Sequence, residues 1–325
     1  MNKQKIGKLL VRVADNREIS LSSFIVLLLI ILAIFVPSFI SGSNLMQIVL
    51  NTVTVCILAL GELTVIITKG IDLSVGATMG LITLIVGQLA LSGWPLWGLL
   101  AIALLVGLVA GLVNGILISL VKLPSIIVTL GTLSVYSGLM YLVTGGNWVT
   151  NLPNYIQNLS SWSFLGFIPG PVVIMLIILL FITIFLRYSR VGRYLYAIGN
   201  NPNAANLAGI NEKRIIVIPY ILTGVLAAIA GVLYLSYNGF STPNTGSSLN
   251  LQAIAAAVIG GANVFGGRGG AIGAVLGALL LGVISEALVF FHLPAVWNDA
   301  AEGLIILLAV VMDSAISRTI RVTRG

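Results

Sequence analysis

The stretch Arg187–Arg214, RYSRVGRYLYAIGNNPNAANLAGINEKR, is a polar run between the apolar runs Ile168–Leu186 and Ile215–Tyr237. It carries five of the sixteen Lys and Arg residues of the chain. A helix needs about 20 predominantly apolar residues to cross the hydrocarbon core of a bilayer, and both flanking runs are close to that length. The stretch therefore predicts a polar loop that joins two membrane-spanning helices.

This loop contains the signature of a short helix. Asn201 is a suitable N-cap, Pro202 suits the first helical position, and Gly209 is typical of a left-handed stop. A helix of small residues buries little surface by itself, which favours a docking element inserted into a partner over a solvated loop. The predicted docking residues are Asn201, Pro202, Asn203, Ala204, Ala205, Leu207, Ala208 and Gly209.

The composition places the whole chain in a membrane. Of its 325 residues, 58% are hydrophobic and only 8% are charged, whereas a soluble domain carries roughly 25% charged residues. The net charge of +7 does not indicate a nucleic-acid partner, because the basic residues lie in small groups beside apolar runs. Cys56 lies in an apolar run and His292 has no ligand-type neighbours, so we expect neither a disulfide nor a metal site.

Ten apolar runs predict an all-α polytopic membrane protein with about ten transmembrane helices. The first, Leu21–Ile40, is longer than the apolar core of a signal peptide, so we expect an uncleaved helix. The other nine runs are Leu45–Thr68, Leu73–Leu91, Trp94–Val121, Ser125–Val143, Ile168–Leu186, Ile215–Tyr237, Leu249–Ala262, Ala271–Phe291 and Ala295–Met312.

The distribution of positive charge supports an even number of spans. With the N-terminus in the cytoplasm and alternating spans, all sixteen Lys and Arg residues fall on the cytoplasmic side, as basic residues do in membrane proteins. This predicts a cytoplasmic N-terminal arm (1–20), a transmembrane domain (21–312) with the cytoplasmic loop 187–214, and a cytoplasmic basic tail (313–325). The outer segment Thr144–Phe167 carries aromatic residues that indicate either a membrane-interface belt or a surface for a periplasmic partner.

Two glycine series and two turns carry further predictions. Gly107, Gly111 and Gly115 recur every fourth residue, as do Gly269, Gly273 and Gly277, and such spacing favours close helix packing. Asp72 is placed to cap the helix that follows it. The glycine-rich turn 260–270 lacks the order of residues in a phosphate-binding loop, so we expect no ATP site in this chain.

The chemistry of the spans is that of neutral polar groups. No catalytic set of titratable residues is present at usable spacing, which disfavours a membrane enzyme. Neutral residues such as Asn51, Thr54 and Asn114 suit either hydrogen bonds to a hydroxyl-rich solute or bonds between helices. Glu62, an acid within a span, indicates either a protonated or lysine-paired structural group or a residue that lines a pathway.

Three motifs resemble those of a known family. GIDLSVGA (70–77), GRYLYAIGNNPNAANLAGI (192–210) and AIAAAVIGGANVFGGRGGAIGAVLGALLLGVI (253–284) are similar to segments of the permease subunits of bacterial ABC importers for monosaccharides, the ribose-type branch. The resemblance covers nearly the whole chain, roughly Ser20–Asp313. It implies a vitamin B12-importer-like permease fold in the bacterial inner membrane. It also implies that Pro202–Ala208 is the coupling helix, held in a cleft of the ATPase.

The resemblance also implies partners. They are a cytoplasmic ABC ATPase subunit, which holds ATP and Mg²⁺, a periplasmic solute-binding protein, and a second permease, identical or paralogous; this chain itself binds no cofactor. Glu62 and Gln252 depart from the family pattern along the expected solute path. The candidate pathway residues are Asn51, Thr54, Glu62, Asn114, Thr129, Thr132, Tyr136 and Gln252.

The expected solute is a monosaccharide or a similar neutral polyhydroxylated molecule. The alternatives are a nucleoside, autoinducer-2 or a branched-chain amino acid, although the uncharged spans argue against a zwitterionic solute. A secondary carrier is a more distant alternative, because it needs no ATPase and no docking helix but does need coupling-ion sites in broken helices.

Overall fold

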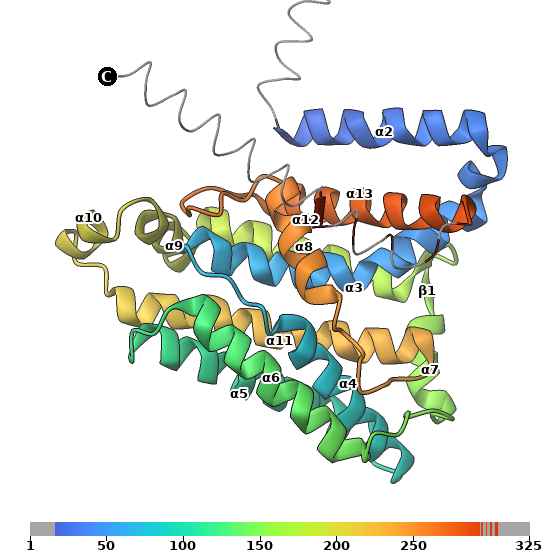
Figure 1. Ribbon diagram of the computed structural model, residues 1–325, viewed down its shortest axis with the longest axis horizontal. Coiled ribbons are helices and arrows are strands. Elements are labelled where there is room, and N and C mark those ends of the chain that lie inside the picture. Colours follow the sequence, from blue (N-terminus) through green and yellow to red (C-terminus); the bar gives the residue numbers. More distant parts are fainter. Residues whose placement is uncertain (1–16, 293, 295–296, 298–299, 301–302, 305–325) are drawn as a thin grey trace, which may run out of the picture.

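The computed structural model describes residues 17–292, together with 294, 297, 300, 303 and 304. Most helices run along the long axis of the molecule (Figure 1). The helices are α2 (Arg17–Phe35), α3 (Gly42–Ile67), α4 (Val75–Leu91), α5 (Leu96–Ser119), α6 (Ser125–Thr144), α7 (Asn154–Ser161), α8 (Gly170–Tyr188), α9 (Arg190–Asn200), α10 (Pro202–Leu207), α11 (Glu212–Asn238), α12 (Leu249–Ile259) and α13 (Ala271–Phe290). A 3-10 turn (Pro37–Ile40) follows α2, and a small hairpin pairs β1 (Ser163–Phe164) with β2 (Ile168–Pro169).

The described residues confirm an all-helical polytopic protein. Seven helices are long and apolar enough to cross a membrane: α2, α3, α5, α6, α8, α11 and α13. The predicted spans at Leu73–Leu91 and Leu249–Ala262 correspond to the shorter apolar helices α4 and α12. The predicted tenth span, Ala295–Met312, lies almost entirely outside the described residues, as do residues 1–16 of the arm and the tail 313–325.

The helix α4 is at the lower limit of the length that spans a bilayer, and α12 is too short to span it alone. At 1.5 Å per residue, the 17 residues of α4 and the 11 residues of α12 extend about 26 and 16 Å. Non-helical segments, 68–74 and 239–248, precede them in the chain. Non-helical backbone is tolerated at membrane depth only where protein or a water-filled cavity surrounds it, and residues in both segments are buried.

The segment before α12 passes very close to the first turns of α4. A Cβ atom on Gly76 would collide with the carbonyl oxygen of Gly246, and one on Gly80 would collide with that of Thr245. Gly246 also has a φ of +90°, which L side chains rarely adopt. Glycine at these positions therefore lets the segment 239–248 lie directly against α4.

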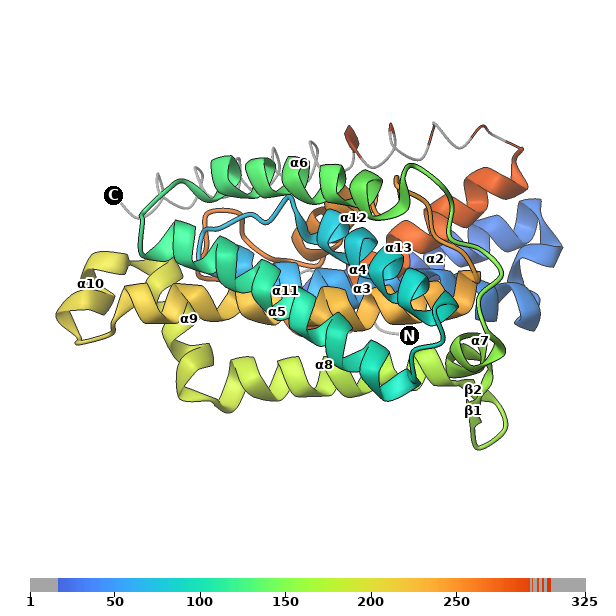
Figure 2. The ribbon, with the colours of Figure 1, turned by 90° about the horizontal axis from the view of Figure 1, so that it is seen from below.

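The core centres on α3 and α11. Of the spanning window of α3, 89% is buried, and Figure 2 shows α6 and α8 at opposite edges of the bundle with α3 and α11 between them. Gly107 and Gly111 of α5 abut the α11 backbone at Gly224 and Tyr220, which confirms the predicted close packing. Van der Waals contact between backbones takes the place of hydrophobic burial in such packing.

The second glycine series is confirmed only in part. Gly273 and Gly277 of α13 pack against the α12 backbone at Gly260 and Ala256. Gly269 does not belong to that helix face, because α13 begins at Ala271 and Gly269 lies in the preceding turn with a φ of +151°. Its contact is with Leu63 of α3.

The two ends of the bundle differ in character, and we call them the α10 end and the α7 end (Figure 1). Among the described residues, none of the Lys and Arg lies in α7, in the hairpin or in the connections 145–153 and 239–248, and each lies near a helix end or in a turn. The α7 end carries α7 and the hairpin, and there Trp148 stacks on Phe240 at 6.0 Å while Val149 pairs with Ser241. The segregation of charge agrees with the predicted clustering of basic residues on one side of the membrane.

Candidate functional site

The helix α10 matches the short helix predicted from the sequence. The side chain of Asn201 accepts a hydrogen bond of 3.1 Å from the backbone N–H of Ala204, and Pro202 occupies the first turn. The helix ends at Leu207, so Ala208 is its C-cap, and Gly209 follows with a φ of +81°. The helix lies at the extremity of the molecule (Figure 1).

The predicted docking residues of α10 differ widely in exposure. Ala205, in the middle of the predicted docking residues, is only 4% exposed and packs against its own chain. Leu207 is 91% exposed, an unusual state for a leucine. The outward-facing apolar side chain of α10 is therefore Leu207, whereas Ala205 packs inward.

The helix α9, which directly precedes α10, was not predicted. Its N-cap Ser189 accepts a hydrogen bond of 2.8 Å from Gly192, and Leu195 and Ile198 are buried. The Arg and Tyr residues among these positions made the segment resemble a loop. Spacing of buried residues at i and i+3 was the available signal for an amphipathic helix.

A tight contact, which we call the glycine junction (Gly199, Gly266 and Gly267 with Ile67), joins α9 to the body of the bundle. Gly267 donates a backbone hydrogen bond of 2.9 Å to the carbonyl of Ile67. A Cβ atom on Gly199 would collide with that same carbonyl. Asn200, the last residue of α9, donates to the carbonyl of Gly267 at 3.4 Å. The chain therefore enters α10 from a point that is fixed against the end of α3.

A groove of about 880 Å³ lies beside α10. It is bounded by the turn between α5 and α6 on one side and by the start of α11 on the other, and it holds the charged residues Lys122, Glu212 and Lys213. Asn206 of α10 donates a hydrogen bond of 3.1 Å to Glu212. The α10 end thus presents an exposed leucine next to a polar, charged groove.

The candidate pathway residues separate into two groups, and the larger group forms a buried network. Thr132 of α6 donates to Asn114 of α5 at 2.9 Å, and Asn114 donates to Ser74 at 2.8 Å. Ser74 donates to Asp72 at 2.6 Å, and the backbone N–H of Asp72 donates to Glu62 of α3 at 3.0 Å. These side chains bond to one another and so join α3, the turn 68–74, α5 and α6.

Two other candidates support the same region. Thr129 donates a hydrogen bond of 3.1 Å to the carbonyl of Ile71 in the turn 68–74. Tyr136, on the same helix α6, donates to the carbonyl of Ala110 at 3.4 Å. Both act between α6 and its neighbours, which matches the alternative of bonds between helices.

Asp72 does not cap α4, contrary to the sequence prediction. Its carboxylate accepts hydrogen bonds from the N–H and hydroxyl of Ser74, at 2.9 and 2.6 Å, within the turn. The first turn of α4 is satisfied from a distant helix, since Gly76 donates to Asn250 of α12 at 2.6 Å.

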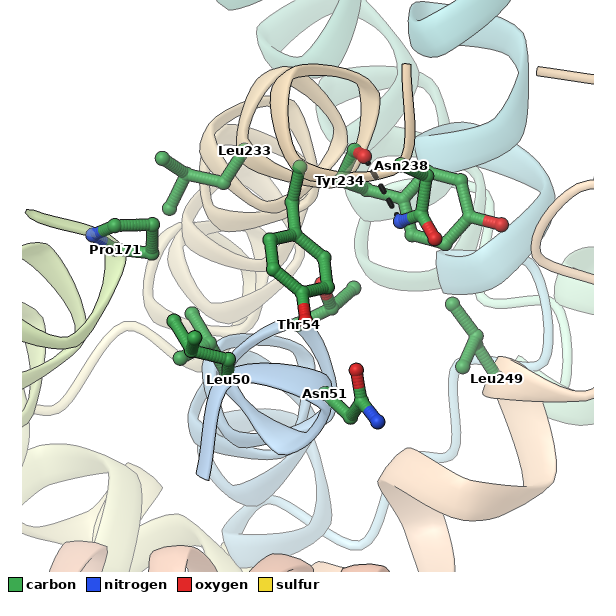
Figure 3. Close-up of a pocket in the computed structure, with 10 residues that line it drawn as sticks. Leu50, Asn51, Thr54, Pro171, Leu233, Tyr234, Asn238 and Leu249 are labelled. Carbon is green, nitrogen blue, oxygen red and sulfur yellow. Dashed lines mark hydrogen bonds between the residues drawn. The ribbon is translucent and has the colours of Figure 1, made fainter. Parts of the chain in front are cut away.

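The second group of candidates, Asn51 and Thr54, lines a pocket of about 220 Å³ (Figure 3). The lining residues are Leu50, Asn51, Val53, Thr54, Pro171, Leu233, Tyr234, Tyr237, Asn238 and Leu249. They come from α3, α11, the start of α8 and the start of α12. Asn238 donates to the carbonyl of Tyr234 at 2.9 Å, drawn as a dashed line in Figure 3. None of the described residues in this lining carries a charge.

The sequence predictions missed three polar lining residues of this pocket. Tyr234, Tyr237 and Asn238 share one face of α11 because they lie three and four positions apart. That spacing can be read from the sequence, but the sequence does not show that this face of α11 packs opposite α3. Gln252, the remaining candidate, is half-buried on α12 one turn beyond Leu249 and is not part of the lining.

The described residues define a polytopic membrane protein, and comparison with known proteins gives its family. Residues 44–310 match the family described as "Branched-chain amino acid transport system / permease component". The chain therefore belongs to this family of ABC transporter permeases, whose members typically lack catalytic activity.

Similar curated proteins are autoinducer 2 import system permease proteins named LsrC. The chain is 36% identical to that of Escherichia coli (strain K12 / DH10B) over 313 residues, covering 95% of this chain and 91% of the relative. It is 39% identical to that of Enterobacter sp. (strain 638) over 306 residues, covering 94% and 89%. It is 38% identical to that of Yersinia pseudotuberculosis serotype O:1b (strain IP 31758) over 313 residues, covering 95% and 89%. No solved structure matches the chain.

Proposed function

We propose that this chain is the membrane-spanning subunit of an ATP-driven importer for autoinducer-2 or a closely related small polyhydroxylated furanone. The observation that carries the proposal is the near full-length similarity, 36–39% identity, to permeases named for that solute. The monosaccharide expected from the sequence becomes the second candidate, favoured by the neutral polar lining of the pocket.

The pocket beside Asn51 supports a neutral, hydroxyl-rich solute. Its volume of about 220 Å³ suits a single five- or six-membered ring. Amide and hydroxyl groups of Asn51, Thr54 and Tyr237 can exchange hydrogen bonds with solute hydroxyls, and the aromatic rings offer apolar faces to a solute ring. The absence of charge among its described lining residues disfavours amino acids, because a carboxylate and an ammonium group would lose their hydration without a partner.

The energy for transport comes, in this proposal, from a separate ATPase subunit that holds ATP and Mg²⁺ and grips α10. The α10 end then faces the cytoplasm of a bacterial inner membrane, with both termini on that side. The pocket, which lies toward the α7 end, opens toward a periplasmic binding protein. A second permease, identical or paralogous, completes the pore.

The glycine junction gives the docked helix a mechanical connection to the pocket. A displacement of α10 moves Gly199, which abuts the carbonyl of Ile67 at the end of α3, and Asn200, which bonds to Gly267. The same helix α3 carries Asn51 and Thr54 in the pocket. A rigid-body movement of α3 at the glycine junction therefore also displaces the pocket residues. Alternating access requires such a coupling between the docked helix and the solute site.

The test is reconstitution of the permease in liposomes with its ATPase and binding protein. We expect ATP-dependent uptake of autoinducer-2 that exceeds uptake of ribose, of a hexose, of a nucleoside and of leucine at equal concentration. Uptake of ribose above autoinducer-2 supports the monosaccharide candidate. Uptake by the permease alone, without ATPase or nucleotide, contradicts the proposal and indicates a secondary carrier.

A further inference from the structure

Two acids are buried side by side at the turn between α3 and α4. Glu62 is 0% exposed and Asp72 is 3% exposed, and the backbone of Asp72 bonds to the carboxyl of Glu62 at 3.0 Å. Neither acid forms an ion pair with a basic residue in the described part of the chain. Lys69, the basic residue of the same turn, is exposed to the surroundings. The lysine pairing considered for Glu62 is therefore not present.

The oxygens of these two acids are satisfied very unequally. Asp72 accepts two hydrogen bonds from Ser74. Glu62 accepts one hydrogen bond on Oε1, and its Oε2 atom is buried without a partner among the described residues. A buried carboxylate oxygen that lacks a partner costs several times more than a neutral one.

A second unpartnered oxygen lies against the same turn. The hydroxyl of Tyr220, on α11, is buried and makes no hydrogen bond of ordinary geometry, although Ser125 lies nearby. A Cβ atom on Gly70 would collide with this hydroxyl, so it abuts the turn 68–74. Tyr220 is also within electrostatic range of both Glu62 and Asp72.

Two adjacent negative charges without a cation have a high free-energy cost in such a site, because burial removes the water that would screen them. One added proton resolves the conflict. Asp72, with two donors, is the acid that keeps its charge, and Glu62, with one donor and apolar neighbours, is the acid that takes the proton.

We propose that Glu62 is held as a neutral carboxylic acid, so that Glu62 and Asp72 form a buried site for a single proton at the α3–α4 turn. The proton makes Glu62 a hydrogen-bond donor and removes the second negative charge from the buried pair. This site is independent of the solute and of the partner subunits.

Loss of that proton places two like charges at the α3–α4 turn. The other titratable groups that face the pair are Tyr220 from α11 and Tyr136 from α6, both neutral, while α5 contributes the uncharged Asn114. No group among these compensates the second charge. Deprotonation therefore drives Glu62 and Asp72 apart and loosens the turn, five residues from the glycine junction at Ile67.

The experiment compares the purified wild-type protein with Glu62→Gln, which copies the shape of a neutral acid. Infrared spectroscopy at neutral pH should show a carboxylic acid C=O band in the wild type that Glu62→Gln lacks. The control Glu286→Gln removes a half-buried acid near the end of α13 and should leave the band in place. A wild-type spectrum without such a band overturns the proposal.

Thermal unfolding as a function of pH provides a second readout. The folded state holds a proton that the unfolded chain releases at neutral pH, so the Tm of the wild type should fall as pH rises above neutral. The Tm of Glu62→Gln should lose that dependence and equal or exceed the wild-type value at high pH. A wild-type Tm that is flat with pH, or a Glu62→Gln protein with the same pH slope as the wild type, contradicts a proton bound at this pair.

Discussion

The backbone N–H of Gly267 lies 2.9 Å from the carbonyl oxygen of Ile67, the last residue of α3. This bond ties the turn before α13 to the end of the central helix, two hundred positions earlier in the chain. The same carbonyl is the atom that a side chain on Gly199 would strike. Three segments therefore converge on one oxygen atom, next to the helix that we propose receives the force of the ATPase.

Gly199→Ala should separate ATP hydrolysis from transport. The new methyl group collides with the carbonyl of Ile67, which forces α9 away from α3 at a cost of about 1–3 kcal/mol. We expect a lower Tm and uptake that falls more steeply than ATPase activity in reconstituted vesicles. Gly42→Ala is the matched control, because a Cβ atom there meets nothing within 4 Å. Equal loss of uptake in both variants argues against a mechanical role of the junction.

Leu207→Asp should weaken ATPase binding without loss of stability. The side chain is 91% exposed, so the free permease loses no packing, whereas a docked apolar contact is replaced by a desolvated charge. We expect affinity for the ATPase subunit to fall at least about tenfold, equivalent to about 1.4 kcal/mol. Leu165→Asp alters a comparably exposed leucine (71%) at the α7 end and should bind the ATPase normally. Normal affinity of Leu207→Asp would discredit α10 as the docking helix.

Thr54→Val should reduce uptake through the pocket. The substitution removes one hydroxyl at nearly constant volume and leaves a solute hydroxyl unpaired, which costs about 1–3 kcal/mol. Initial rates of uptake at low solute concentration should fall by roughly tenfold or more. Thr183→Val, the control, changes a threonine of α8 whose hydroxyl bonds only within its own helix. Unchanged uptake in Thr54→Val places the solute elsewhere.

Asn114→Ala should destabilise the permease without altering which solute it selects. The amide joins Thr132 of α6 to Ser74 of the α3–α4 turn, and its removal leaves buried hydroxyl groups less satisfied at a cost of about 1–3 kcal/mol. Thermal unfolding in detergent measures the change. Asn158→Ala on the exposed face of α7 should fall within about 0.5 kcal/mol of the wild type. A changed order of preference among solutes would instead indicate that Asn114 lines the solute pathway.

Local sequence signals were sufficient for much of the fold. Apolar length predicted the long helices, and the order of Asn201, Pro202 and Gly209 predicted α10, because caps and stops act within a few residues. The same reasoning overextended α4 and α12. An apolar run does not distinguish helix from buried non-helical backbone, so the predicted runs extend two residues before the start of α4 and three residues past the end of α12.

The arrangement of the site depended on contacts that a single sequence does not encode locally. Asn114 and Ser74 are 40 positions apart, and Gly76 and Asn250 are 174 apart. Spacing alone therefore grouped Asn114 and Thr132 with Asn51 and Thr54, although the first two close a hydrogen-bonded network and the second two line a pocket. The role of a polar residue within a membrane helix is set by the helix it meets.

The crossing of α4 with the segment before α12 restricts how this protein can change over generations. At Gly76, Gly80 and Gly246, a single added methyl group would collide with a backbone oxygen. Relieving the collision would require the backbone to shift. In a saturation mutagenesis library selected for growth on the solute, these three codons should return almost only glycine. Substitutions that accumulate elsewhere in the protein should therefore leave these three glycines unchanged.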